Sequence, residues 1–254
     1  MTARVVALRS FAPPFEAVSL DAEAAALDAE AQGLPAEAIV ARAIEMFRGR
    51  IALVSSFGAE AAALLHFVAK VDPATPVLFL ETGKHFAQTI AYRQDLARQL
   101  GLRDVRDIRP LAEEAARADP KGDLWRRDND ACCALRKVRP LAGALSGFDA
   151  WFTGRKRVHG GLRAHLPVVE AASPHIKINP LARWSGEDVE AYAARYALPP
   201  HPLVEQGFAS IGCWPCTAPI AKGDDARAGR WRGLSKTECG IHRQTVSPRI
   251  EETA

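Results

Sequence analysis

The chain has 254 residues, 48% of them hydrophobic, with 33 Lys and Arg against 30 Asp and Glu. This hydrophobic content is enough for a sizeable buried core and argues against a disordered chain. The net charge of +3 is too small for a polybasic nucleic-acid binder, so an anion site would need a local concentration of charge.

The N-terminal stretch gives no sign of export or membrane insertion. Its apolar run, Val5 to Leu8, is too short for a secretory h-region. A run of about 18 apolar residues, as a spanning helix needs, does not occur in the sequence. We therefore expect a cytoplasmic enzyme.

Apolar runs alternate with amphipathic stretches along most of the chain. Residues 15–48 are rich in Ala, Glu and Leu and predict two helices that are broken near Gly33 and Pro35. Beyond residue 50, β-α units predict an α/β fold, a mostly parallel sheet with helices on both faces. The predicted strands are 51–58, 76–82, 105–108, 151–154 and 175–181, and the predicted helices beyond residue 50 are 59–70, 85–100, 111–118 and 185–196.

Three predicted strand ends carry residues suited to an anion. Ligands of open parallel sheets bind beyond the carboxyl ends of the strands, where 55–58, 82–84 and 154–157 are expected to converge. The loop Ser55-Ser56-Phe57-Gly58-Ala59-Glu60 leads from a strand into a helix, where backbone N–H groups can approach a phosphate. It lacks the Gly-Lys-Ser/Thr of a P-loop, and an ordinary tight turn is the alternative.

The five cysteines are an odd number in a chain without an export signal, which favours metal or catalytic thiols over disulfides. Cys132 and Cys133 are adjacent, and Cys213 and Cys216 form a C-x-x-C, so these four could hold an iron-sulfur cluster or a closed zinc site. Adjacent cysteines on a helix project about 100° apart, which weakly favours the larger cluster.

Two other interpretations of these four cysteines stay open. Cys132 and Cys133 could be apolar core residues of a helix that runs towards Leu145. Cys213 and Cys216 could form a thioredoxin-like redox pair, although such a pair normally opens a helix and here lies among glycine and prolines.

Cys239 stands apart, close to the C-terminus. Lys236 and His242 lie near it in sequence and could favour the reactive thiolate, which a flexible tail could carry. An exposed cysteine in a frayed terminus is the alternative.

Two basic groups suit an anionic substrate, although such charges are often only solvated surface. They are Arg155, Lys156, Arg157 and Arg163, and Lys222, Arg227, Arg230 and Arg232.

Taken together, the motifs resemble those of the assimilatory sulfonucleotide reductases over roughly residues 45 to 245. The double cysteine together with the C-x-x-C resembles the branch that acts on adenylyl sulfate (APS), rather than the branch for the 3'-phosphorylated nucleotide (PAPS). The motifs that carry the resemblance are Ser55-Ser56-Phe57-Gly58-Ala59-Glu60, Cys132-Cys133-Ala134-Leu135-Arg136-Lys137, Thr153-Gly154-Arg155, Cys213-Trp214-Pro215-Cys216 and Glu238-Cys239-Gly240-Ile241-His242.

The resemblance implies an adenine-nucleotide α-hydrolase-like fold, similar to that of PP-loop enzymes, with a mobile C-terminal tail. It implies a four-iron four-sulfur cluster on Cys132, Cys133, Cys213 and Cys216, and a thioredoxin-type or glutaredoxin-like reductant. Cys239 would attack the sulfate sulfur of APS, expel AMP and become an S-sulfocysteine, from which the reductant releases sulfite. The implied division is a helical lead-in over 1–45, a nucleotide-binding reductase domain with the cluster site over 46–220, and a segment carrying Cys239 over 221–254.

The resemblance also implies the residues that contact the substrate. Thr82-Gly83-Lys84-His85 departs from the family, where Arg often follows the glycine, and Ala87 replaces a frequent proline. Lys84 is therefore not assigned a role, and which of Ser55 and Ser56 meets phosphate stays open. The expected contacts are Ser55, Ser56, Gly58, Thr82, Gly83, Lys137, Gly154, Arg155, Arg163, Arg227, Arg230 and His242.

Three other functions are alternatives to this one. A PAPS reductase that carries a cluster is the nearest. A PP-loop tRNA thiolase would want a fuller Ser-Gly-Gly-x-Asp-Ser loop than the chain has after its first strand. A zinc module that binds nucleic acid is disfavoured by the small net charge. We expect neither nucleic-acid nor membrane partners, and a homo-oligomer is left open.

Overall fold

The computed structural model describes residues 19–234 and 236–242. A six-stranded sheet, in the order β3-β2-β1-β4-β6-β5, forms its centre. All neighbouring strands are parallel except β5, which runs antiparallel to β6, so the predicted mostly parallel sheet is confirmed. The strands are β1 (Ile51–Val54), β2 (Val77–Leu80), β3 (Val105–Ile108), β4 (Ala150–Phe152), β5 (Val169–Ala172) and β6 (His175–Ile178).

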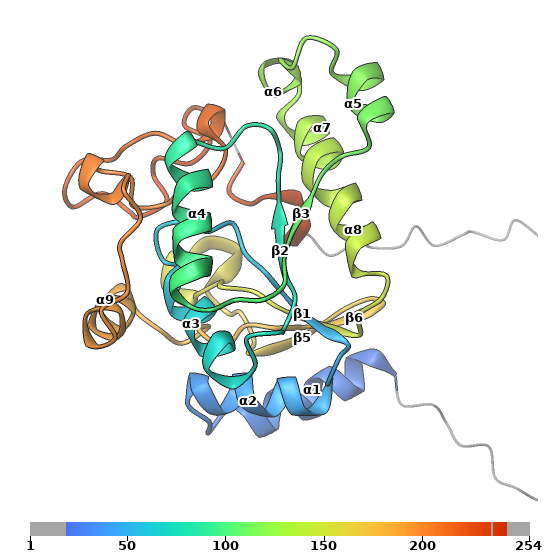
Figure 1. The fold of residues 1–254 in the computed structure, drawn as a ribbon, viewed down its shortest axis with the longest axis vertical. Coiled ribbons are helices and arrows are strands. Elements are labelled where there is room, and N and C mark those ends of the chain that lie inside the picture. Colours follow the sequence, from blue (N-terminus) through green and yellow to red (C-terminus); the bar gives the residue numbers. More distant parts are fainter. Residues whose placement is uncertain (1–18, 235, 243–254) are drawn as a thin grey trace, which may run out of the picture.

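Helices cover both faces of the sheet, as predicted. In Figure 1, α4 and α8 lie on opposite sides of β2 and β3, and α1 and α2 lie together at the bottom of the view. The helices are α1 (Leu20–Ala31), α2 (Ala36–Met46), α3 (Ala61–Val71), α4 (Ala87–Gln99), α5 (Ala112–Ala118), α6 (Leu124–Arg127), α7 (Asn129–Cys133), α8 (Arg139–Leu145) and α9 (Gly186–Arg195).

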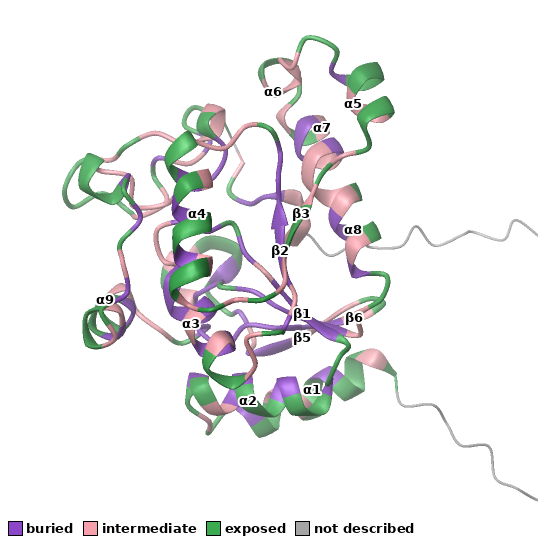
Figure 2. Cartoon of the chain, viewed as in Figure 1, coloured by how far each residue is buried: buried purple, intermediate pink, exposed green. Residues whose placement is uncertain are grey.

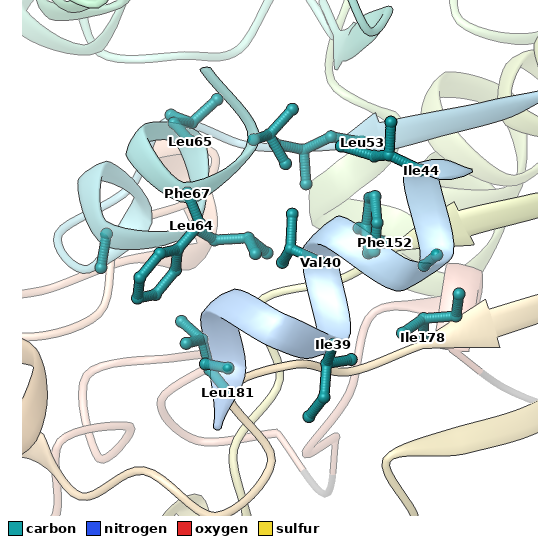
Figure 3. Close-up of a cluster of buried hydrophobic side chains, with 14 of the residues drawn as sticks. Ile39, Val40, Ile44, Leu53, Leu64, Leu65, Phe67, Phe152, Ile178 and Leu181 are labelled. Atoms are coloured by element: carbon teal, nitrogen blue, oxygen red, sulfur yellow. The ribbon is translucent and has the colours of Figure 1, made fainter. Parts of the chain in front are cut away.

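Strand residues alternate between two hydrophobic cores because successive side chains point to opposite faces. In β1, Leu53 belongs to the larger core, whereas Ala52 packs with Leu141 and Leu145 of α8. Figure 2 shows the resulting burial of the central strands. Figure 3 shows α2 seated in the larger core, with Val40 among side chains from α3 and from the strands.

Two local details bear on the predictions. The helix expected after Ser185 begins there with a capping box, because Asp188 N–H donates to Ser185 Oγ at 3.0 Å and Ser185 N–H donates to Asp188 Oδ2 at 2.8 Å. Strand β5 was not predicted.

The C-terminal tail was expected to be mobile. Residues 243–254 of this tail lie outside the described ranges. Within those ranges, no helix has the length and apolar character to span a bilayer.

Candidate active site

A cavity of about 210 Å³ lies beyond the carboxyl ends of β1 and β4. The chain winds from β1 to β2 on one side and returns to β4 on the other, so the strand order reverses here. Open parallel sheets bind ligands at such a reversal. The predicted residues that line this cavity are Ser55, Ser56, Gly58, Lys137, Gly154, Arg155, Arg163, Arg227, Arg230, Cys239 and His242.

One wall of the cavity is the loop between β1 and α3. Phe57 is buried with a φ of 48°, a left-handed conformation that is costly for a bulky residue. Its N–H donates to Ser55 Oγ at 3.1 Å, whereas Ser56 is exposed. Gly58 approaches Ile211 so closely that a Cβ would lie 3.0 Å from the Ile211 carbonyl oxygen. The loop is thus held in one tight shape, in which Ser56 is the serine open to a ligand.

Arginines give the cavity its positive charge. Arg155 is paired with Glu170 and donates to Asn179 Oδ1 at 3.3 Å. Burial lowers the pKa of Arg155 to about 10, and the charge of Arg163 adds to that effect. The same two causes lower the pKa of Arg227 to about 10. Like charges held together away from water favour an anion between them.

Arg163 reaches the cavity from a turn that reverses sharply. Gly160 and Gly161 have φ values of 58° and 55°, which glycine adopts readily. The following turn leaves Leu162 77% exposed while Arg163 is 8% exposed. Two consecutive left-handed glycines therefore direct the guanidinium inward.

A carboxylate that sequence reasoning did not assign lies in the same cavity. Glu60 pairs with Lys156 Nζ at 2.8 Å and lies 3.2 Å from His159 Nε2. Burial raises the pKa of Glu60, but the hydrogen bond from His159 and the charge of Lys156 outweigh it and hold that pKa at about 2. Glu60 is the last residue of the motif that begins at Ser55, and Lys156 belongs to the basic group that begins at Arg155. Both residues therefore stood in motifs that the sequence shows.

The C-terminal segment brings Cys239 into the cavity wall. Lys236 Nζ lies 2.6 Å from Asp130 Oδ1 and 3.3 Å from Cys133 Sγ. Cys239 is 8% exposed. A hydrogen bond from Cys133 holds the pKa of Cys239 well below its ordinary value, and the charge of Lys137 reinforces this while burial opposes it. The charge of Lys137 does not depend on a proton on Cys133, and it favours the thiolate, which is the nucleophilic form.

His242 ends the described part of this segment and is half-buried. Burial, together with the positive charges of Arg155 and Lys177, keeps the pKa of His242 well below its ordinary value, so the ring is neutral near pH 7. Within the described ranges, His242 Nδ1 and Arg230 Nε are buried without a hydrogen-bond partner. Both residues line the cavity, so these nitrogens are available to a polar ligand.

The other four cysteines gather around a second, smaller cavity. Cys132 and Cys133 end α7, directly before a π-helical turn over Ala134–Val138. Cys213 directly precedes the turn Trp214–Cys216, and Cys216 is the last residue of that turn. Asn129 Nδ2 donates to Cys216 Sγ at 3.1 Å. The cysteine residues of both motifs therefore come together in space.

The two cavities share a wall. Lys137 and Trp231 line both. Burial opposes the charge of Lys137, but the sulfurs of Cys213, Cys239 and Cys133 keep its pKa above the ordinary value. Across residues 19–234 and 236–242, no three His, Cys, Asp or Glu side chains are grouped as one metal ion would require.

Two predicted contacts lie elsewhere. Thr82 lines the cysteine cavity, where its Oγ1 is 3.3 Å from Cys213 Sγ. Gly83 lines neither cavity, and its N–H donates to Glu81 Oε1 at 2.7 Å. A further residue of the cavity that was not predicted is Glu238, whose carboxylate pairs with Arg163 across 75 residues of sequence.

Comparison with known proteins points to one family. Residues 50–219 match the family described as "Phosphoadenosine phosphosulfate reductase domain". An adenosine 5'-phosphosulfate reductase of Chelativorans sp. (strain BNC1) is 54% identical over 81% of this chain and 84% of its own length. A phosphoadenosine 5'-phosphosulfate reductase of Gloeobacter violaceus is 42% identical over 81% and 87%.

Solved structures agree with the fold. A phosphoadenylyl-sulfate reductase from Candida auris, in complex with phosphate, superposes with a TM-score of 0.65 and 28% identity, over 77% of this chain and 96% of its own. An FMN adenylyltransferase from Candida glabrata, at 14% identity and a TM-score of 0.55, over 84% of this chain and 73% of its own, shares the fold alone. The chain therefore belongs to the phosphoadenosine phosphosulfate reductase family, the sulfonucleotide reductases.

Proposed function

We propose that the chain reduces APS to sulfite and AMP, with Cys239 as the nucleophile. The observation that carries the proposal is the position of Cys239 in the wall of an arginine-rich cavity at the strand ends. Relatives named adenosine 5'-phosphosulfate reductase, at 54% and 52% identity, support APS over PAPS as the substrate. Assimilatory sulfate reduction in the cytoplasm is the role we expect.

The reaction takes three displacements at sulfur. In the first, the Cys239 thiolate attacks the sulfate sulfur of APS, an S–S bond forms, and the S–O bond to AMP breaks with its electron pair on AMP. In the second, one thiolate of a thioredoxin-type dithiol attacks Cys239 Sγ and expels sulfite. The second thiol of the reductant then displaces Cys239, so the reductant supplies two electrons and leaves as a disulfide.

The side chains around Cys239 suit this chemistry. A thiolate that attacks a sulfate must overcome the repulsion between two anions, and fixed cations reduce that repulsion. Arg163, Arg227 and Arg230 line the cavity and would contact phosphate and sulfate oxygens, and Lys137 lines both this cavity and the cysteine cavity. His242 Nδ1 is a further polar contact for the nucleotide. Ser56 and the backbone of the β1–α3 loop would receive the remaining phosphate oxygens.

Cys132, Cys133, Cys213 and Cys216 would hold a four-iron four-sulfur cluster. Two features support this fit: the four thiols line one cavity, and Asn129 Nδ2 donates to Cys216 Sγ, as outer-shell donors to cluster sulfurs do. When bound, the cluster would supply a local field beside Lys137, which lines both cavities.

A single variant tests the assignment of the nucleophile. The chain purified without oxygen is expected to be brown and to release sulfite from APS with thioredoxin. Cys239→Ser should keep the colour and lose sulfite release, whereas Cys216→Ser should lose the colour. Trapped sulfite found on Cys213 or Cys216 rather than on Cys239 would overturn the proposal. Faster turnover of PAPS than of APS would instead identify the rival substrate.

A further inference from the structure

Glu238 precedes the nucleophilic cysteine and lies inside the group of cavity arginines. It is 7% exposed. Arg163 meets both of its carboxylate oxygens, through Nε to Oε1 and through Nη2 to Oε2 at 2.8 Å. Arg227 Nη2 lies 3.7 Å from Oε2 and donates to the Thr237 carbonyl at 2.8 Å. An anion that belongs to the protein thus occupies the center of its positive charge.

The geometry of this pair is the one that sulfate and phosphate oxygens would take. A guanidinium presents two parallel N–H groups to a carboxylate, and it binds phosphate or sulfate in the same forked way. Burial raises the pKa of Glu238, but Arg163 and Arg227 outweigh it and hold the pKa below its ordinary value. The carboxylate is therefore charged near pH 7 and cannot share Arg163 with a substrate oxyanion without cost.

The backbone next to Glu238 is held by other contacts. Arg227 binds the Thr237 carbonyl, Lys236 binds Asp130, and the His242 ring stacks on Trp151 with centroids 6.2 Å apart. The Glu238 side chain could therefore leave Arg163 while Cys239 stays at the cavity.

We propose that Glu238 is a positioning residue that occupies Arg163 between turnovers and gives way to an oxyanion of the sulfonucleotide. The inference rests on the proposed function, because it takes the substrate anion to bind at Arg163. Glu238 neutralises the arginines when the cavity is empty. Because an oxyanion must displace Glu238 from Arg163, substrate and AMP bind more weakly, and AMP leaves more readily after the reaction.

The test measures binding in full-length protein purified with its cluster and carrying Cys239→Ser, so that no turnover occurs. Adding Glu238→Gln removes the competing charge, so APS is expected to bind about tenfold more tightly by calorimetry. Glu238→Asp keeps the charge and should stay close to the parent. Glu190→Gln, at an exposed position on α9, controls for net charge.

The sign of the change separates the two roles that Glu238 could have. A purely structural Glu238 would loosen Arg163 when replaced, so unchanged or weaker binding of APS in Glu238→Gln would overturn the inference. Inorganic sulfate is titrated in the same series because it needs only the arginines. If no variant binds APS or PAPS, the proposed function is wrong, and the sulfate series alone then decides whether Glu238 competes with an anion.

Discussion

Gly240 lies so close to Val138 that a Cβ on Gly240 would be 3.0 Å from Val138 Cγ2. Val138 ends the π-helical turn that follows Cys133, and Gly240 follows Cys239 in sequence. The contact therefore joins the helix that carries two of the cysteines to the segment that carries the proposed nucleophile. We expect this contact to position Cys239 at the cavity.

Gly240→Ala is expected to lower kcat by about tenfold or more, because small misplacements of reacting groups are costly. Val138→Ala alone should stay near the wild-type rate, and in the double variant it should restore most of the loss, since it removes the methyl group that the new Cβ meets. Steady-state sulfite release from APS measures both. A double variant as slow as Gly240→Ala would show that the contact does not position Cys239.

Lys137 is the cation that links the two cavities. Lys137→Ala is expected to reduce kcat/KM for APS by about 100-fold, the cost typical of losing one fixed charge at a reacting centre, with the visible absorbance of the cluster unchanged. Lys222→Ala, at an exposed position, is the matched control and should leave the rate as it is. Unchanged turnover in Lys137→Ala would remove its electrostatic role, and loss of the absorbance would assign it to cluster binding instead.

Much of the fold could be predicted because its signals are local. Leu53 and Ala52 face different cores, yet both belong to one short apolar run, which is the pattern of a buried parallel strand. Strand β5 could not be recognised in the same way. Its sequence, Val169–Ala172, has one β-branched residue and a glutamate, and only pairing with β6 makes it a strand.

In the candidate site, too, residues in local motifs could be predicted, whereas residues whose role depends on a distant partner could not. The cysteines and arginines were visible as motifs, and the structure brings most of them to one cavity or the other. The roles of Glu60 and Glu238 depend on partners 96 and 75 residues away, Lys156 and Arg163, and no local pattern announces such a pair. Thr82 was expected beside the substrate but lies beside Cys213, because Thr82 and Lys84, just after β2, line the cysteine cavity.

The pair between Glu60 and Lys156 should be measurable as stability. The Lys156 side chain is 1% exposed, so Glu60→Gln leaves a buried ammonium without its carboxylate. A loss of about 2 kcal/mol in the unfolding free energy at pH 7 is expected, reduced from the value for a fully buried pair because Glu60 is 31% exposed. Adding Lys156→Met should recover part of it. Equal losses in the single and double variants, by urea unfolding, would contradict the coupling.

His201 should make the fold sensitive to acid. It is fully buried, its Nδ1 accepts the Leu203 N–H at 3.1 Å, and its Nε2 lies 3.0 Å from Thr89 Oγ1, so a proton on Nδ1 would meet a donor. Burial lowers the pKa of His201 from 6.5 to about 4. The unfolded chain therefore takes up this proton first as the pH falls, and stability is lost between pH 6.5 and pH 4.

From pH 7 to pH 5, this histidine alone should lower the unfolding free energy by roughly 2 kcal/mol. His201→Gln is less stable at pH 7 but lacks the titrating group, so the gap between wild type and variant should narrow by that amount at pH 5. Between pH 7 and pH 8 the gap should stay constant, because both values lie above the ordinary histidine pKa. Urea unfolding at the three pH values measures it, and a gap that is as wide at pH 5 as at pH 7 would mean that His201 accepts a proton in the folded protein as readily as in the unfolded chain.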